Sequence, residues 1–89
     1  MLVSHGDQQL QFHDIFAARL LYERAAAAGS GAAATAMGKT YDPRFLAQIR
    51  AKDITPDPAT ATEWYRRAAA LGQRDAEGLL AGLSAAPVQ

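Results

Sequence analysis

Apolar residues recur at helical spacing between Pro58 and Gly72, the most clearly bounded stretch of the chain. Both ends carry helix signals, because aspartate at 57 is a good N-cap, proline suits the first helical position and glycine suits the left-handed residue after the last turn. The pattern therefore predicts one amphipathic helix. Its apolar stripe consists of Ala61, Trp64, Tyr65, Ala68 and Leu71.

The same signals predict short helices elsewhere in the chain. N-cap residues precede three of them, and these helices are expected at Ile15–Ala28 after Asp14, at Gly31–Thr40 after Ser30 and at Pro43–Lys52 after Asp42. We expect further helices at about Gly6–Phe12 and Arg74–Gly82, and a loop at Asp53–Asp57. In the helix after Asp14 we expect an apolar face of Ala18, Leu21, Tyr22, Ala25 and Ala28, widened by Phe16 and Leu20.

Gly38 lies inside the helix predicted at Gly31–Thr40. Glycine inside a helix costs roughly 1 kcal/mol relative to alanine, so a packing reason is expected. We expect the backbone of a neighbouring helix to approach closely at this position.

Two stretches of the chain match each other at an offset of 43 residues, which places Tyr22 over Tyr65. Seven of the twelve positions from Tyr22 to Ala33 are identical in the later stretch, including the tyrosine and a glycine in the same register. Self-similarity at a period of roughly 20–50 residues is typical of stacked helix pairs, each of which buries its apolar face only by packing on the next.

These residues resemble the Sel-one-like repeats, which are relatives of the tetratricopeptide repeats. The first half of that pattern is matched by Ala33, Met37, Gly38 and Tyr41. The second half is matched by Ile54, Asp57, Ala61, Trp64, Tyr65, Ala68, Ala69, Gly72 and Ala76. The resemblance places a full repeat at about 33–72, between half-repeats at about 14–29 and 74–84, in a single domain.

Three positions depart from the family pattern. Asp53 replaces a connector glycine, Thr60 replaces a lysine and Ala81 stands where glycine is expected. The connector is also longer than usual, because of the helix predicted at Pro43–Lys52. The resemblance implies an all-α fold of antiparallel helix pairs in a short right-handed α/α superhelix, and a protein-binding module without catalytic residues or cofactors.

Composition narrows the function classes. Nine basic and nine acidic residues give zero formal net charge with no block of like charge, which argues against nucleic acid or anionic membrane as a partner. Twenty-one alanines favour closely packed helices over a large apolar core, and there is no cysteine. No stretch reads as a signal peptide or a membrane span. The compartment stays open: cytoplasmic is the default expectation, periplasmic if the chain is a fragment, and the composition favours a bacterial source.

Several residues of reactive type have simpler interpretations. His5 and His13 lie in a weakly patterned segment, and a zinc site needs three or four convergent ligands. We interpret Glu23, Glu63 and the Arg66-Arg67 pair as surface residues, and Gly29-Ser30-Gly31 as a turn between helices, because it lacks the lysine of a phosphate loop. Trp64 and Tyr65 lie on the apolar stripe, so we interpret them as core residues. We expect no metal site.

The remaining candidate site is the concave face of the predicted superhelix, which is lined by the first helix of each pair. Its non-core positions are Thr35, Lys39 and Asp42, with Glu77 from the following helix alongside. We expect a protein or peptide partner to bind there. The alternative is a structural or capping segment of a longer repeat protein that self-associates through its open ends, for instance as a homodimer. An enzyme or a metal-binding domain is the third hypothesis.

Overall fold

The computed structural model describes residues 14–51 and 53–85, which form five α-helices and no strand within these ranges. The helices are α2 (Ile15–Ala27), α3 (Gly31–Lys39), α4 (Pro43–Gln48), α5 (Pro58–Ala70) and α6 (Arg74–Ala85). The all-α prediction is therefore confirmed for the described part of the chain. The helix expected at 6–12 and both histidines lie outside the described residues.

The helix boundaries follow from the capping residues named above. The side chains of Asp14, Ser30, Asp42 and Asp57 each accept a hydrogen bond from a backbone N–H in the first turn of α2, α3, α4 and α5, respectively. At the other ends of α2 and α5, Gly29 and Gly72 adopt left-handed backbone with φ of 99° and 93°. Glycine meets this requirement without a steric cost, so both predicted C-caps are confirmed.

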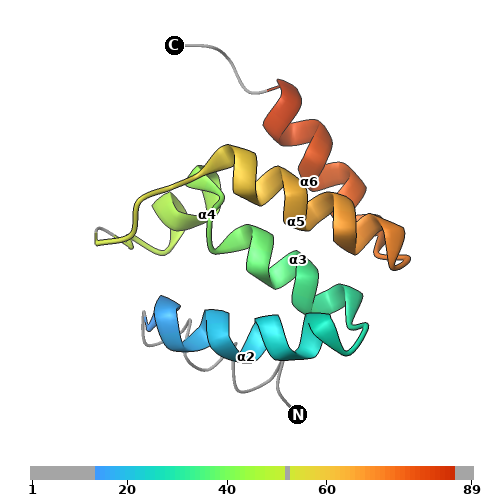
Figure 1. Ribbon diagram of the computed structural model, residues 1–89. Coiled ribbons are helices and arrows are strands. Elements are labelled where there is room, and N and C mark those ends of the chain that lie inside the picture. Colours follow the sequence, from blue (N-terminus) through green and yellow to red (C-terminus); the bar gives the residue numbers. More distant parts are fainter. Residues whose placement is uncertain (1–13, 52, 86–89) are drawn as a thin grey trace.

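The helices stack in chain order, with α3 between α2 and α5, and α5 between α3 and α6 (Figure 1). The short helix α4 lies beside this stack, at the end where the chain leaves α3 and returns to begin α5 (Figure 1). A backbone hydrogen bond of 2.8 Å, donated by the N–H of Asp57 to the carbonyl of Tyr41, closes this excursion. The core is a set of small residues around two fully buried tyrosines, Tyr22 and Tyr65.

Helix α3 is buried on nearly all sides because it has a helix neighbour on both flanks. All six consecutive residues from Ala33 to Gly38 are buried. A Cβ added to Gly38 would collide with ring atoms of Tyr65 from α5. The expectation of a close neighbour at Gly38 is thus correct in kind but wrong in identity, since the neighbour is an aromatic ring and not a helix backbone.

Two helix ends differ from the prediction by three residues or more. Helix α4 stops at Gln48 because Arg50 takes a left-handed backbone with φ of 57°, and the N–H of Ala51 then bonds the carbonyl of Leu46 at 3.0 Å. This Schellman-type ending is made without glycine. Helix α6 continues past Gly82 to Ala85, so Gly82 does not end it.

The apolar face predicted for α2 is wider than the one observed. Ala18 and Tyr22 are fully buried, whereas Phe16 and Leu20 are 63% and 62% exposed. Among the helices of the described residues, α3 is the main neighbour of α2, so only a narrow stripe of α2 is covered. Trp64 also lies at the rim of the core, where it is partly buried.

A search of the described residues for membrane-spanning helices finds none with the length and hydropathy that crossing requires.

Candidate functional site

Asp42 is the centre of a buried polar network where α3, α4 and α5 meet. The residue is 2% exposed and caps α4, its Oδ1 accepting a hydrogen bond of 2.9 Å from the backbone N–H of Arg44. The Arg44 guanidinium adds bonds of 3.3 Å from Nε to Oδ1 and 3.0 Å from Nη2 to Oδ2. The hydroxyl of Tyr65 donates to Oδ2 at 2.7 Å. The carboxylate is therefore fully partnered.

This arrangement fixes the charge of each group. Burial raises the pKa of Asp42, but the hydrogen bonds from Arg44 and Tyr65 outweigh it, so the pKa lies below its usual value. The hydrogen bond to Asp42 raises the pKa of Arg44. Burial, and then donation to the carboxylate, raises the pKa of Tyr65. Asp42 and Arg44 are thus an ion pair at neutral pH, with a neutral tyrosine as a third member.

Arg44 also connects this network to the last helix. Its Nη2 donates to the carbonyl of Leu79 in α6 at 3.1 Å. A Cβ added to Gly82 would collide with the same guanidinium, so the missing side chain there provides the space that the contact needs. Arg44 therefore joins α4 to α6.

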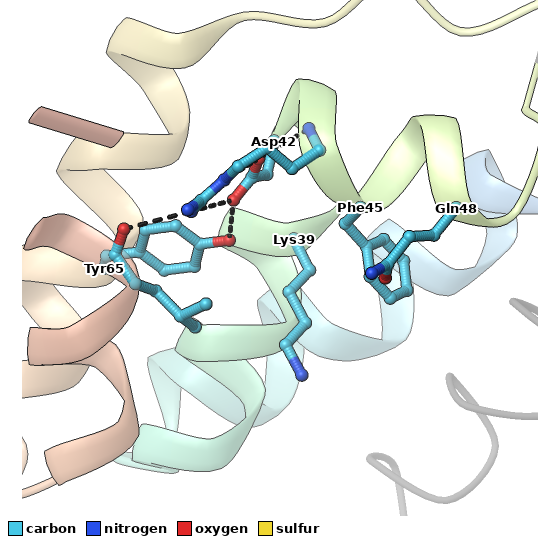
Figure 2. A pocket seen from close by; sticks show the side chains of 7 residues that line it. Lys39, Asp42, Phe45, Gln48 and Tyr65 are labelled. Carbon is cyan, nitrogen blue, oxygen red and sulfur yellow. Dashed lines mark hydrogen bonds and ion pairs between the residues drawn. The ribbon is translucent and has the colours of Figure 1, made fainter. Parts of the chain in front are cut away.

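Beside the network, the surface is hollowed by a cavity of about 360 Å³ that lies between α3, α4 and α6. Asp42, Arg44, Tyr65 and Leu79 line one part of it, and Lys39, Phe45 and Gln48 line the other (Figure 2). Figure 2 shows the Tyr65 hydroxyl directed at Asp42, while the Lys39 side chain extends away from the network.

The polar side chains of the second group make no hydrogen bond or ion pair within the described residues. The ammonium of Lys39 lies 5.8 Å from the centroid of the Phe45 ring, and no ion pair to Lys39 occurs within residues 14–51 and 53–85. The side-chain amide of Gln48 is exposed and makes no hydrogen bond in that part of the chain. On one wall of the hollow, the polar groups of Asp42, Arg44 and Tyr65 bond one another. On the other wall, the polar groups of Lys39 and Gln48 can bond a ligand.

A different set of contacts holds the C-terminal end of α3 to α2. Arg19 donates from Nε to the hydroxyl of Thr40 at 3.0 Å and from Nη2 to its carbonyl at 2.7 Å. The same guanidinium stacks on the Tyr41 ring, 3.8 Å from the centroid. A cation at a helix C-terminus is favoured by the helix dipole. Arg19 therefore stabilises the C-terminal end of α3, and this role does not fall to Lys39.

The structure brings together two of the four residues predicted to bind a partner. Lys39 and Asp42 both line the hollow. Thr35 is 6% exposed, and its hydroxyl donates to the carbonyl of Gly31 one turn earlier, so it is a packed residue of α3. Glu77 is exposed on α6 and does not line the hollow.

The sequence interpretation missed Arg44, Phe45 and Gln48 as parts of the site. Phe45 is half-buried, and Gln48 is exposed. Phe45 and Gln48 are three residues apart on a helix, so they share a face, and that spacing is the signal from which they could have been found.

The other residues of reactive type form no site of their own. Glu23, Glu63, Arg66 and Arg67 are exposed, and the Arg67 guanidinium lies 5.1 Å from the centroid of the Trp64 ring. Gly29-Ser30-Gly31 forms the turn between α2 and α3. A search of the described residues for three or more metal-ligating side chains finds no such group.

Comparisons of the chain with protein-family models, with curated proteins and with solved structures return no match.

Proposed function

We propose that this chain is a non-catalytic protein-binding module of the Sel-one-like type, which takes a protein or peptide partner in the hollow between α3, α4 and α6. In this proposal the helix pairs form a short right-handed superhelix, and α3 and α6 line its concave side. Partner binding in the concave surface is the usual mode of helical-repeat proteins.

The helix correspondence supports the repeat part of the proposal. A shift of 43 residues carries the bounds of α2, Ile15–Ala27, onto those of α5, Pro58–Ala70. Both helices follow an aspartate cap and end before a left-handed glycine. The matched positions are also buried alike: Ala18 with Ala61, Tyr22 with Tyr65, Ala25 with Ala68 and Ala33 with Ala76.

The observation that carries the binding function is the hollow itself. Its volume of about 360 Å³ falls within the range of ligand sites, roughly 300–1,000 Å³. One wall is held rigid by the Asp42–Arg44–Tyr65 network, which limits the ordering cost of binding. The other wall offers a half-buried aromatic ring, a cation and an amide.

The test is affinity capture with two matched baits. Gln48→Tyr fills the mouth of the hollow, and Glu63→Tyr places the same side chain on an exposed position of α5. We expect a partner retained by wild type to be retained by Glu63→Tyr and lost by Gln48→Tyr, with equal helicity by circular dichroism. Equal retention by both variants would place the binding site elsewhere.

Exposed apolar residues on α2 support the alternative of self-association. Phe16 and Leu20 are 63% and 62% exposed. Two exposed large apolar residues one turn apart can pair with an equivalent surface. That reading predicts a concentration-dependent mass by sedimentation, abolished by Leu20→Glu. A constant monomer mass over the same concentrations would remove it.

A further inference from the structure

Three charged residues line the hollow, and two of them form an ion pair with each other. Asp42 and Arg44 neutralise each other at 3.0 Å, and the carboxylate is buried behind the guanidinium. Lys39 is the third charged residue of the lining, and it has no ion-pair partner in the described part of the chain. An incoming group therefore meets a single positive charge on a half-buried lysine.

Apolar side chains share the lining of the hollow with that charge. Phe45 and Leu79 are both half-buried and belong to the same lining. The ammonium of Lys39 lies 5.8 Å from the Phe45 centroid, so an anion paired with it would lie within reach of the ring and its surroundings. Such a lining favours a ligand with one negative group next to an apolar one.

The single unpaired charge argues against nucleic acid as the ligand, and the Gln48 amide favours a peptide. Nucleic acid binding uses several cations along a backbone, and the hollow offers one cation that is not already paired. The exposed amide of Gln48 has both a donor and an acceptor, which is the complement of a peptide group. A backbone amide, an apolar side chain and a carboxylate together describe a stretch of acidic peptide.

From this juxtaposition we infer that the hollow binds an acidic peptide segment, in which a glutamate or aspartate pairs with Lys39 and an adjacent apolar side chain packs on Phe45 and Leu79. The inference rests on the proposed protein-binding function and adds the chemical class of the partner. The Asp42–Arg44 pair acts as the fixed wall of the site, and Gln48 bonds the peptide backbone.

The test selects peptides from a displayed random library on the full chain, and then measures the affinity of synthetic versions by fluorescence anisotropy. We expect selected peptides to share an acidic residue beside an apolar one. Lys39→Met, which keeps the aliphatic stem, should raise Kd by roughly three- to ten-fold, the range of a partly exposed ion pair. Lys39→Arg should restore binding, and replacing the peptide's Glu by Gln should match the effect of Lys39→Met.

Arg24→Met is the matched control, because Arg24 is an exposed cation on α2 and its loss changes the net charge by the same amount. It should leave Kd unchanged. Selected peptides without an acidic residue, or an affinity that is equal in Lys39→Met and wild type, would overturn the inference while leaving the binding function standing. A library that yields no binder to the folded chain would overturn both.

Discussion

Helices α2 and α5 have matching limits and caps but differ in the side-chain contacts that link their surroundings to the rest of the fold. Each has 13 residues, follows an aspartate cap and ends at a left-handed glycine. On the α5 side, the hydroxyl of Tyr65 donates to Asp42, and Arg44 extends the network to α6. On the α2 side, Arg19 donates a hydrogen bond to Thr40 and stacks on the Tyr41 ring at the end of α3.

This difference shows which part of the chain supplies the residues of the hollow. Positions that match at the offset of 43 residues supply small and aromatic core residues. Asp42, Arg44, Phe45 and Gln48 belong to the connector between α3 and α5, outside the two matched stretches. The repeated positions form the packed core of the helices, and helix α4 in the connector supplies much of the lining of the hollow. Substitutions in the two sets should therefore have separable effects.

The largest effect should follow truncation of the shared core. Tyr65→Ala removes a fully buried ring and its hydrogen bond, and we expect a loss of about 3–5 kcal/mol in the free energy of unfolding. Trp64→Ala should cost clearly less, because Trp64 is only partly buried at the core rim. Urea unfolding followed by circular dichroism measures both, and equal costs would contradict this assignment of core and rim.

Two of the helical glycines, Gly38 and Gly78, form a matched pair. Gly38→Ala forces a methyl group against the Tyr65 ring, and we expect a loss of about 1–3 kcal/mol from overpacking. At Gly78 an added Cβ meets no atom within 4 Å, so alanine should stabilise the fold by about 0.5–1 kcal/mol through helix propensity. Thermal unfolding of the two variants should shift in opposite directions. A shift of the same sign in both would show that Gly38 does not face the ring.

Asp42 should make the fold sensitive to acid. Because hydrogen bonds hold its folded pKa below the unfolded value of about 3.9, its contribution is present above that pH and disappears as pH falls through the folded pKa. We expect Asp42→Asn to cost about 1–3 kcal/mol at neutral pH. The gap to wild type should close in acid.

Urea unfolding of both proteins at a series of pH values checks this dependence. Asp57, whose hydrogen bonds with Thr60 lower its pKa, is present in both proteins, so its own acid dependence cancels in the comparison. A gap that stays constant down to the most acidic point would contradict the role given to the Asp42 carboxylate.

The smallest effect concerns the end of α4. Arg50 takes the left-handed place that Gly29 and Gly72 hold at the ends of α2 and α5. A left-handed conformation costs a non-glycine residue roughly 1–2 kcal/mol, so Arg50→Gly should stabilise the chain by about 1 kcal/mol. Gly29→Ala should destabilise it by a similar amount. Differential scanning calorimetry resolves both shifts, and a lower midpoint for Arg50→Gly would indicate that its side chain stabilises the loop.

Much of the fold was predictable because local signals set the helix limits. Asp14, Ser30, Asp42 and Asp57 cap helices as expected, and the glycine ends of α2 and α5 are where the sequence places them. The end of α4 was not predictable by the same logic, since an arginine occupies its left-handed residue.

The site was less predictable than the fold because it depends on how many neighbours each helix has. Treating α3 as a one-sided helix suggested that Thr35 and Asp42 face a partner. Contacts of α3 with α2 and α5 bury Thr35, and Asp42, which follows α3, is buried where it bonds Arg44 and Tyr65. Only Lys39, in the last turn of α3, keeps its charge toward the hollow. The spacing of Phe45 and Gln48 places them on one face of α4, but no local pattern specifies that this face borders the hollow.

The most direct measurement of the central claim is a backbone amide NMR titration of the full chain with a library-selected acidic peptide. Binding in the hollow predicts perturbations that cluster at Lys39, Phe45, Gln48 and Leu79 and vanish in Lys39→Met. Perturbations centred on Phe16 and Leu20 of α2, with the hollow unaffected, would contradict the claim.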